Sequence, residues 1–408
     1  MNKPKIRFTG YEDDWEQRKL DDWGTFYYGR SCPKWSVTED ATIPCIRYGE
    51  LYTKFGAKID KVYSYTNMSP ENLRFSKGTE VLIPRVGEDP MDYNHCTWLS
   101  MPNVAIGEMI SVFNTDNNPL FTATMFNATL QNEFAMRVEG GSVTNLYFEK
   151  LKNIDVSFPA LKEQEKIASY FDILDHLITL HQRKCEETKT LKKYMLQKMF
   201  PQNRTNVPEI RFDGFTDTWE QRKVTELGDI YIGLVTTMTA HYTDHGTLLI
   251  RNSDIKDGKF EFDTEPIFLD DKFAEANKSR MHKVGDVITV HTGDVGTSAV
   301  ITENEANSIG FATIVTRPNN EILDSYYLSV FLNTDKHKNW AVQMSTGDGR
   351  TNYNLREYTE LIVPIPVINE QKKIAEYIMA LNNLITLHQR KCDELVKIKK
   401  YMLQNMFV

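Results

Sequence analysis

The amino-acid sequence predicts an α+β protein in which two globular α/β domains are separated by two long antiparallel helices. These helices are expected to form an intramolecular coiled coil, so that the chain is a pseudo-two-fold tandem repeat. Three observations carry this prediction: a helical segment of 38 residues occurs twice, an opening motif occurs twice, and the segments between them diverge. Self-similarity at a fixed spacing indicates duplicated structural units.

The duplicated helical segment occupies residues 163–200 and 370–407, and its two copies agree at 25 of 38 positions without a gap. Mostly apolar residues follow a 4-3-4-3 spacing from Ile167 to Met199 and again from Ile374 to Met406, with His and Lys at a few of these positions, which is the heptad stripe of a coiled coil. Neither copy contains Gly or Pro, which favours continuous helices about 50 Å long. Since the second globular domain lies between the helices, pairing of the stripes requires an antiparallel arrangement that brings the two termini close together.

The start of each globular domain is duplicated too, because residues 4–19 match residues 208–223 at 11 of 16 positions, WEQRK included. A short polar linker bracketed by Pro201 and Pro208 joins the halves. The expected order is a first globular domain (1–160), a long helix (161–200), the linker (201–208), a second globular domain (209–367) and a second long helix (368–408).

Between these shared ends, residues 48–140 and 252–347 share little sequence and form two divergent inserts. The expected strands in them are short, apolar and bounded by turn residues: 80–83, 287–290 and 312–316. The expected helices are 325–334 and 335–344. Each insert is therefore predicted to belong to a small α/β domain.

Composition restricts the class of protein. The chain has 408 residues, 41% hydrophobic and 25% charged, as in soluble proteins of two or more domains. No apolar run reaches the about 18 residues of a membrane span, and the N-terminus has no apolar signal core, so we expect a cytoplasmic protein. The five cysteines form no CxxC pair and are expected to be reduced, buried thiols. The net charge of −8 disfavours a sequence-blind nucleic-acid binder, because phosphate neutralisation needs clustered Lys and Arg.

Motifs for catalysis are missing from the sequence. The Gly-bearing segment Thr292–Ser298 lacks the Lys of a phosphate-binding loop and is predicted to be a strand turn. The segment Asn117–Leu120 lacks the second proline and the aromatic residue of the amino-methyltransferase motif, so a turn is expected there as well. His181 and His388 are equivalent heptad positions, where a polar pair that fixes helix register is favoured over a metal site. We expect no catalytic residue and no metal site in this chain.

The doubled WEQRK motif, the two Pro-then-EQxKI helix starts at 159–167 and 366–374, and the divergent inserts resemble the specificity subunits of type I restriction-modification systems, the HsdS family. The resemblance covers essentially the whole chain. It implies that each insert is a target recognition domain that reads one half of a gapped double-stranded DNA site. A spacer of about 50 Å also exceeds the about 34–36 Å between half-sites one turn of B-DNA apart, so a DNA target should be bipartite and asymmetric.

The resemblance also implies partners. Two methylation subunits (HsdM) dock on the helices and methylate adenine N6 with S-adenosylmethionine, and two restriction subunits (HsdR) complete an ATP-dependent nuclease. S-adenosylmethionine, ATP and Mg are therefore expected on the partner subunits and no cofactor on this chain, which would be a non-catalytic specificity subunit.

Candidate DNA-contacting residues were chosen because Arg and Lys suit guanine and phosphate, and Asn and Gln suit adenine. Arg47 and Arg251 are favoured, since each follows an equivalent Ile. The alternative for any single candidate is an ordinary surface residue. The first insert offers Arg30, Lys34, Arg47, Tyr48, Lys54, Lys58, Arg85, Asn94 and His95, and the second offers Arg251, Asn252, Lys256, Lys278, Arg280, His291, Arg350, Asn352 and Tyr353.

Charged positions that recur on both helices could give identical docking surfaces for two copies of one partner. Solvation alone is an equally weighted explanation, and contact with phosphates of the unread spacer is a third. The candidates are Arg183, Lys184, Lys192, Lys193, Arg390, Lys391, Lys399 and Lys400.

Two other functions stay open at this point. The acidic net charge and the lack of a basic stripe are compatible with a two-headed coiled-coil scaffold whose inserts bind proteins. An orphan subunit that has lost its partners would have the same sequence pattern.

Overall fold

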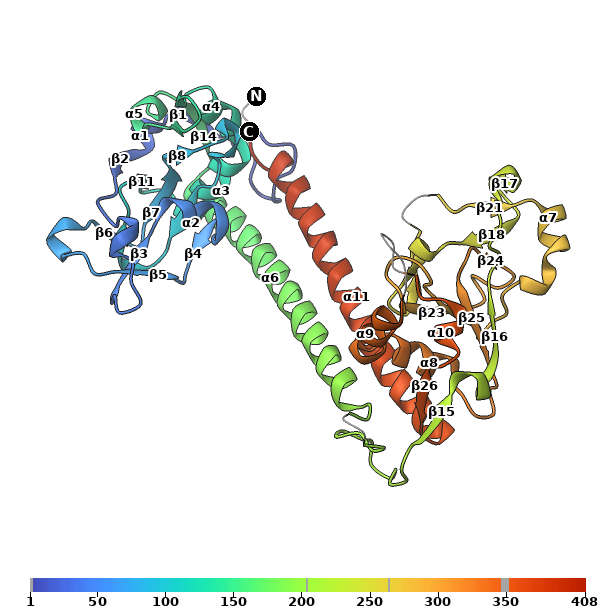
Figure 1. Cartoon of the computed structure of the whole chain (residues 1–408). Coiled ribbons are helices and arrows are strands. Elements are labelled where there is room, and N and C mark those ends of the chain that lie inside the picture. Colours follow the sequence, from blue (N-terminus) through green and yellow to red (C-terminus); the bar gives the residue numbers. More distant parts are fainter. Residues whose placement is uncertain (1–2, 203–204, 263–264, 346–351) are drawn as a thin grey trace. The chain divides into compact units, whose positions relative to one another are not determined.

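The computed structural model describes residues 3–202, 205–262, 265–345 and 352–408, and the chain divides into two compact units (Figure 1). Unit 1 comprises Met1–Gln182 with Gln389–Val408, and unit 2 comprises Arg183–His388. Each unit therefore takes a helical segment from both long helices and is completed by residues from both halves of the sequence.

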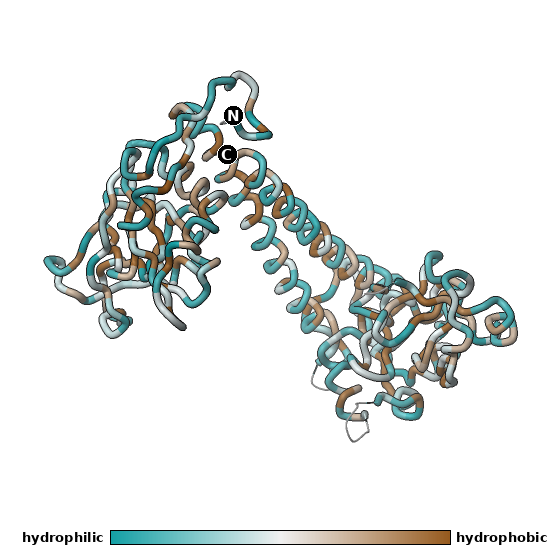
Figure 2. Tube along the Cα trace, turned by 90° about the horizontal axis from the view of Figure 1, so that it is seen from above, coloured by the Kyte–Doolittle hydropathy of each residue, from teal (hydrophilic) through white to brown (hydrophobic). Residues whose placement is uncertain are grey.

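The two predicted long helices are α6 (Leu161–Lys198) and α11 (Ile368–Asn405). The predicted heptad stripe is confirmed, since all of its residues are buried or half-buried, and hydrophobic and hydrophilic residues alternate along both helices (Figure 2). Within unit 1 the start of α6 packs antiparallel on the end of α11, and Asp175 accepts a hydrogen bond from Lys399. The main-chain N–H of Ile6 donates to the carbonyl of Asn405 over 2.9 Å, so the two ends of the chain meet in unit 1 as expected.

The globular part of unit 1 contains a five-stranded sheet (β2-β11-β7-β9-β4), a four-stranded sheet (β5-β3-β10-β6), a three-stranded sheet (β12-β13-β8) and the pair β1-β14. Its strands are β1 (Glu16–Lys19), β2 (Gly24–Tyr28), β3 (Ile43–Ile46), β4 (Lys58–Ile59), β5 (Ser64–Thr66), β6 (Phe75–Lys77), β7 (Glu80–Pro84), β8 (Val86–Gly87), β9 (Thr97–Leu99), β10 (Pro102–Ile106), β11 (Ile110–Thr115), β12 (Glu139–Gly140), β13 (Thr144–Asn145) and β14 (Asp155–Phe158). Its short helices are α1 (Leu20–Trp23), α2 (Tyr48–Thr53), α3 (Pro119–Thr129), α4 (Gln131–Ala135) and α5 (Phe148–Leu151).

Unit 2 contains two four-stranded sheets (β16-β25-β22-β23 and β17-β21-β18-β24) and the pairs β15-β26 and β19-β20. Its strands are β15 (Glu220–Lys223), β16 (Gly228–Ile232), β17 (Tyr242–Thr243), β18 (Thr247–Ile250), β19 (Ile255–Lys256), β20 (Lys259–Phe260), β21 (Phe268–Leu269), β22 (Val287–Thr289), β23 (Ser298–Val300), β24 (Ile309–Gly310), β25 (Ile314–Pro318) and β26 (Ile362–Ile365). Its short helices are α7 (Asp271–Ala276), α8 (Ser325–Leu332), α9 (Asp335–Met344) and α10 (Leu355–Tyr358).

The divergent inserts nevertheless share a topology. The order β2-β11-β7-β9 in unit 1 corresponds to β16-β25-β22-β23 in unit 2. The parallel pair of each second sheet, β3 with β10 and β18 with β24, is also shared, with Ile46 opposite Ile106 and Ile250 opposite Gly310. The two inserts therefore share a backbone arrangement, called the backbone frame below, although their sequences differ. Their side chains can be compared position by position on this frame.

The duplicated motifs meet where each long helix begins. In unit 1 the guanidinium of Arg7 donates two hydrogen bonds of 2.7 Å to the carboxylate of Glu163. In unit 2 Arg211 binds Glu370 in the same way, over 2.7 and 2.8 Å. Both glutamates are buried. In each unit the buried ion pair therefore joins the Arg of the duplicated IRF sequence to the Glu of the duplicated EQ sequence at the start of the long helix.

The glutamine that follows each of these glutamates fixes the long helix to its globular domain. The side-chain oxygen of Gln164 accepts from the main-chain N–H of Asn118 over 2.9 Å, and that of Gln371 accepts from Asp324 over 2.9 Å. Asn118 and Asp324 are the N-caps of α3 and α8, which pack on the central sheets. The chain therefore passes from sheet to long helix through a buried, fully hydrogen-bonded junction.

Each helix end packs on the opening motif of the other half. The ring of Trp15 lies 6.3 Å from that of Phe407 at the end of α11, and the ring of Trp219 lies 6.1 Å from that of Phe200 just after α6. All four side chains are buried. Because each tryptophan packs on the phenylalanine of the other half, the Trp of the opening motif and the Phe at the helix end are duplicated together.

Several local expectations can be compared with the structure. Helices 325–334 and 335–344 are confirmed as α8 and α9, and the Gly-bearing segment 292–298 is the predicted turn, between β22 and β23. The prediction of a turn at Asn117–Leu120 is wrong, because Asn118 is the N-cap of α3 and Pro119 is its first residue. The strand expected from 312 begins at Ile314, since Ala312 has a φ of 49° and lies in a turn. All five cysteines are buried, and no helix of the described residues is long and apolar enough to cross a membrane.

Candidate nucleic-acid interface

The candidate site in each unit lies where the parallel strand pair ends. In unit 1 the N–H of Gly107 donates to the carbonyl of Ile46 over 3.0 Å, and in unit 2 the N–H of Phe311 donates to Ile250 over 2.8 Å. Arg47 and Arg251 come directly after these isoleucines, so the predicted equivalence of the two arginines is confirmed at the level of the backbone. The surrounding turns hold most of the candidate DNA-contacting residues.

Arg47 and Arg251 each begin a short helical turn. The N–H of Arg47 donates to the carboxylate of Glu50 over 2.9 Å, and that of Arg251 donates to Asp254 over 2.8 Å. The Arg251 guanidinium also forms an ion pair of 2.8 Å with Asp254, whose side chain is buried. The side chain of Arg251 therefore has a role in folding, because a buried carboxylate needs hydrogen bonds and a countercharge. The bond from Arg47 to Glu50 comes from the main chain, and the countercharge of Glu50 is Lys54.

The structure brings three candidates of the second insert together. The side-chain oxygen of Asn252 accepts from the N–H of His291 over 2.8 Å, the ring of His291 contacts the hydroxyl of Thr292 over 2.7 Å, and this hydroxyl donates to Asn352 over 2.8 Å. Burial lowers the pKa of His291, so the ring is neutral at pH 7 and offers hydrogen bonds instead of charge. The cluster is half-exposed and presents amide and imidazole groups suited to base edges.

Equivalent candidates lie together in the first insert. The N–H of Leu146 donates to the carbonyl of Arg85 over 2.8 Å, just as the N–H of Tyr353 donates to His291 over 2.8 Å. Arg85 therefore occupies the place of His291, and by the same frame Tyr48 occupies the place of Asn252. The Arg85 guanidinium lies 4.9 Å from the ring centre of Tyr28 and donates to the carbonyl of Glu108 over 3.3 Å.

Two further candidates of the first insert are exposed near this cluster. Arg30 follows β2, and its N–H donates to the carbonyl of Ile106 over 2.8 Å. Lys34 lies on the same connection in an exposed turn. Both side chains face solvent and are available for phosphate or base contacts.

Other candidates bind their own chain. Lys54 pairs with Glu50 over 3.0 Å, Lys58 pairs with Asp172 of α6 over 3.4 Å, and Lys278 pairs with Glu275. The amide of Asn94 donates to the carbonyl of Asn127 over 3.0 Å, and the ring of His95 contacts the carbonyl of Asp92 over 2.7 Å. Each of the five side chains therefore already has a partner in its own chain, and a role of these residues in DNA contact stays a prediction.

Three remaining candidates have different outcomes. Lys256 is half-buried in β19, and Arg350 lies outside the described residues. Tyr353 is fully buried in the core of unit 2, against His337, Trp340 and Tyr358. Its assignment as a base-reading residue is contradicted, because the ring could reach a base only if the core opened.

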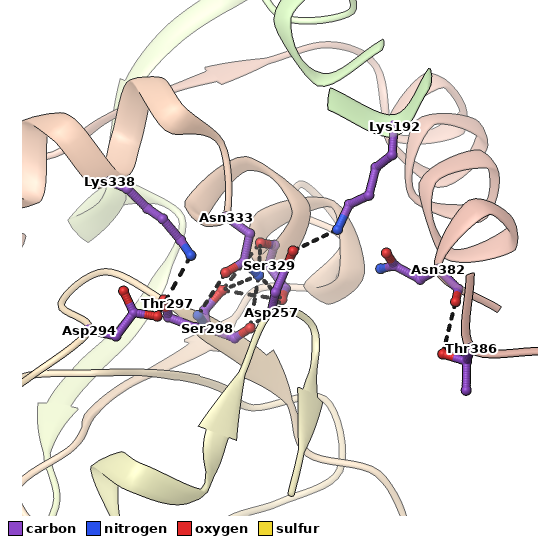
Figure 3. Close-up of polar contacts among 10 residues, drawn as sticks. All are labelled: Lys192, Asp257, Asp294, Thr297, Ser298, Ser329, Asn333, Lys338, Asn382 and Thr386. Atoms are coloured by element: carbon purple, nitrogen blue, oxygen red, sulfur yellow. Dashed lines mark hydrogen bonds and ion pairs between the residues drawn. The ribbon is translucent and has the colours of Figure 1, made fainter. Parts of the chain in front are cut away.

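The docking candidates divide into two groups. Lys192 and Lys399 are turned inward: Lys192 pairs with Asp257 over 2.6 Å (Figure 3), and Lys399 pairs with Asp175. Their side chains are 12% and 26% exposed, which leaves little of either for a partner to contact. Arg183, Lys184, Lys193, Arg390, Lys391 and Lys400 are exposed, and for them docking stays a prediction.

The two inward-facing lysines also show a difference between the units. The place of Asp175 on α6 is taken on α11 by Asn382 (Figure 3), which carries no charge, and Lys192 reaches a strand turn instead. A hollow of about 1010 Å³ lies here in unit 2 between the end of α6, the β19–β20 turn and α11. The equivalent hollow in unit 1, beside Lys399, is about 140 Å³.

Two side chains of this region escaped sequence reasoning. Asn145 occupies the place of Asn352, and the signal for it is that the same residue type stands at the same distance before each long helix. Arg74 occupies the place of Arg280, and the faint signal for it is the similar spacing of LRFSKG and SRMHKVG. Within the described residues no group of three or more His, Cys, Asp or Glu side chains is placed to hold a metal ion.

Comparison with known proteins gives a consistent result. The family model described as the type I restriction modification DNA specificity domain matches residues 12–190 and 216–397. The MjaVIII specificity subunit of Methanocaldococcus jannaschii is 20% identical over 279 residues, which are 65% of this chain and 64% of that protein. The EcoBI specificity subunit of Escherichia coli is 26% identical over 136 residues, which are 33% and 28%. The chain thus spans less than two thirds of the length of these curated relatives.

Solved structures show the same fold. The S subunit of a type I restriction-modification system from M. genitalium superimposes with a TM-score of 0.63 over 100% of this chain and 99% of that one, at 13% identity. A chain from a structure of an assembled type I R-M system superimposes with a TM-score of 0.52 over 97% and 98%, at 15% identity. Because the family model covers both repeats and most of the residues, the chain belongs to the family of type I restriction-modification specificity subunits.

Proposed function

We propose that the chain is the non-catalytic subunit that gives a type I restriction-modification complex its DNA specificity. Each globular domain reads one half of a gapped, bipartite site in double-stranded DNA, and α6 and α11 set the distance between the halves. Chemistry on the DNA is left to partner subunits, which use S-adenosylmethionine for adenine-N6 methylation and ATP with Mg for restriction.

One observation carries this proposal. The two inserts place different side chains on the same backbone frame, with Tyr48 in the place of Asn252 and Arg85 in the place of His291. Positions that recognise different bases should differ in this way, because side-chain hydrogen-bonding groups encode base identity. The exchange of aromatic, amide, guanidinium and imidazole groups at one surface is what two readers of different half-sites require.

Two methylation subunits are proposed to dock on repeated surfaces of α6 and α11. Besides the exposed charges, each helix exposes a tyrosine at the equivalent place: Tyr194 is 49% exposed and Tyr401 is 58% exposed. Leu191 and Ile398, also equivalent, are 43% and 45% exposed. Exposed aromatic and aliphatic side chains on a helix are typical of protein interfaces, and their duplication suits two copies of one partner.

The experiment is a genome-wide map of N6-methyladenine in a host that lacks adenine methylation, with the chain expressed beside its methylation subunit. The expected result is one gapped, asymmetric motif, which gives both half-sites and the spacer. No new methylation by a soluble, associated complex would contradict the proposal. It would favour the scaffold function that the acidic net charge allows, or an orphan subunit.

A further inference from the structure

Arg74 and Arg280 make the same contacts in the two units although they lie in the divergent inserts. Arg74 donates to the carbonyl of Tyr28 over 2.7 Å, and its guanidinium lies 5.0 Å from the ring centre of Tyr27. Arg280 donates to the carbonyl of Ile232 over 3.0 Å and lies 5.6 Å from the ring centre of Tyr231. The two tyrosines are equivalent residues of the repeat.

Neither guanidinium is neutralised by a carboxylate of the described residues. Arg251 and Arg317, by contrast, form ion pairs with the buried side chains of Asp254 and Asp286. Arginine has five N–H donors, and the contacts above leave most of those of Arg74 and Arg280 available, with Arg74 exposed and Arg280 half-exposed.

The tyrosine ring that contacts each arginine positions the guanidinium and leaves its positive charge unneutralised. Burial raises the pKa of Tyr27 and of Tyr231 to about 12, so both phenols are neutral at pH 7 and interact with the guanidinium through the ring face. The guanidinium is thus held in one orientation before any ligand arrives. Preorganisation of this kind lowers the entropic cost of binding.

The backbone below the two arginines is equally fixed. Gly29 and Gly233 follow the strands that the arginines hold, and a Cβ on either would come within 2.1 or 2.4 Å of the carbonyl of Gly107 or Gly310. Only glycine fits there. Each arginine is therefore anchored at a defined distance from the turns that carry the candidate base-reading residues.

The positions around this shared arginine differ between the units. Arg30 of unit 1 is replaced by Leu234 in unit 2, and Glu108 is replaced by Ala312. Tyr48 and Arg85 also differ from their equivalents in unit 2. Side chains that differ can encode different half-sites. A side chain that both readers share does not distinguish one half-site from the other, and contacts to phosphate are the ones that position a protein on DNA without encoding sequence.

We propose that Arg74 and Arg280 each bind a phosphate of the DNA backbone, at the same place relative to the two half-sites, and so set the register in which the differing side chains meet the bases. The planar guanidinium fork matches two phosphate oxygens. This inference rests on the proposed function and assigns two of its contacts.

The test measures binding of the complex with its methylation subunit to a duplex that carries both half-sites of the methylation map, over a range of salt concentrations. In Arg74→Gln and Arg280→Gln the side-chain amide can still donate to the main-chain carbonyl, but the charge is lost. Each is expected to reduce the slope of log K against log salt by about one, with the melting temperature and the methylated motif unchanged. Arg74→Lys should keep the slope, and Lys272→Gln, an exposed lysine on α7, is the matched control for loss of one charge.

Each contrary outcome has a distinct meaning. An unchanged slope with a lower melting temperature would assign the arginines to folding alone and overturn the inference. A changed base in one half-site would overturn it as well, because the arginine would then read sequence. Failure of the wild-type complex to bind any duplex in preference to others would reject the proposed function instead.

Discussion

Single residues repeated in the two units form buried ion pairs with a clear energetic role. Glu163 and Glu370 are almost inaccessible to solvent, and each accepts two hydrogen bonds from one arginine. A bidentate pair of this kind is favourable only while both partners are present, since one buried charge without the other is costly. The pairs therefore hold the opening segments to the long helices.

Replacing one residue of an Arg–Glu ion pair tests whether the pair stabilises its unit. Glu370→Gln leaves the guanidinium of Arg211 unpaired and is expected to lower the free energy of unfolding of unit 2 by about 3–5 kcal/mol, measured by urea denaturation. The double variant Arg211→Met with Glu370→Leu should recover much of the loss. A decrease no larger than the about 0–1 kcal/mol of a surface pair would contradict the assigned role.

Two buried histidines make unit 2 sensitive to acid. Burial lowers the pKa of His282 and of His337 to about 4, below the about 6.5 of an unfolded chain. The unfolded state then binds more protons between these values, so stability is complete above about pH 6.5 and falls as the pH drops towards 4, by up to about 3 kcal/mol for each histidine. Unfolding measured across this range should show that slope, and the variant His282→Gln with His337→Gln should flatten it. A slope equal in both proteins would argue against this cause.

Whether a residue of the candidate site could be predicted from the sequence depended on the residue. Arg47 and Arg251 could be singled out because a fixed offset of the repeat aligns them. Arg280 was a candidate, but Arg74 and its equivalence to Arg280 could not be recognised, because the second insert is two residues longer before this point and the same offset no longer aligns the two arginines. Tyr353 was mistaken for a surface residue because its neighbours are polar, and local composition does not say which side chain of a short segment faces the core.

Among the elements, the long helices were the most predictable from sequence. A heptad stripe over about nine turns, duplicated and free of Gly and Pro, leaves little choice of structure. The strands of the inserts are short, and their pairing joins residues far apart in the sequence, such as Cys45 with Ala105. No local pattern specifies such pairings, so the sheet order became clear only in the folded chain.

The ends of the long helices are structural parts of the units they reach. Phe407 at the end of α11 packs against Trp15, Phe121 and Phe171. Phe407→Ala should therefore cost about 3–5 kcal/mol in unit 1 and increase amide hydrogen exchange there, while unit 2 stays unchanged. Phe200→Ala is the mirrored control and should act on unit 2. Equal effects of one substitution on both units would contradict the described packing.

The exposed tyrosines of the helices test the docking proposal. Tyr194→Ala or Tyr401→Ala should each remove one methylation subunit, so that the mass of the complex falls from two bound copies to one, and the double variant should bind none. Glu165→Ala, an exposed position on the first turns of α6, is the control and should keep both copies. Retention of two copies by the double variant would exclude these tyrosines from the interface.

At the scale of the whole molecule, duplication explains both what is constant and what varies. The ion pairs, the glutamine junctions and the Trp–Phe contacts recur in the two units and build the same frame twice. The inserts carry different side chains on that frame. One chain can therefore present two different readers, which a symmetric dimer of one reader cannot do.

The most direct measurement compares methylation maps of the wild type with those of Tyr48→Ala and Asn252→Ala, each expressed with the methylation subunit. The two residues hold equivalent places in the two units, so each substitution should relax the bases of one half-site only, a different half for each variant. The length of the unread spacer should stay the same in all three maps. A substitution that alters both half-sites, or two variants that methylate the wild-type motif without change, would contradict the account of one reader per unit.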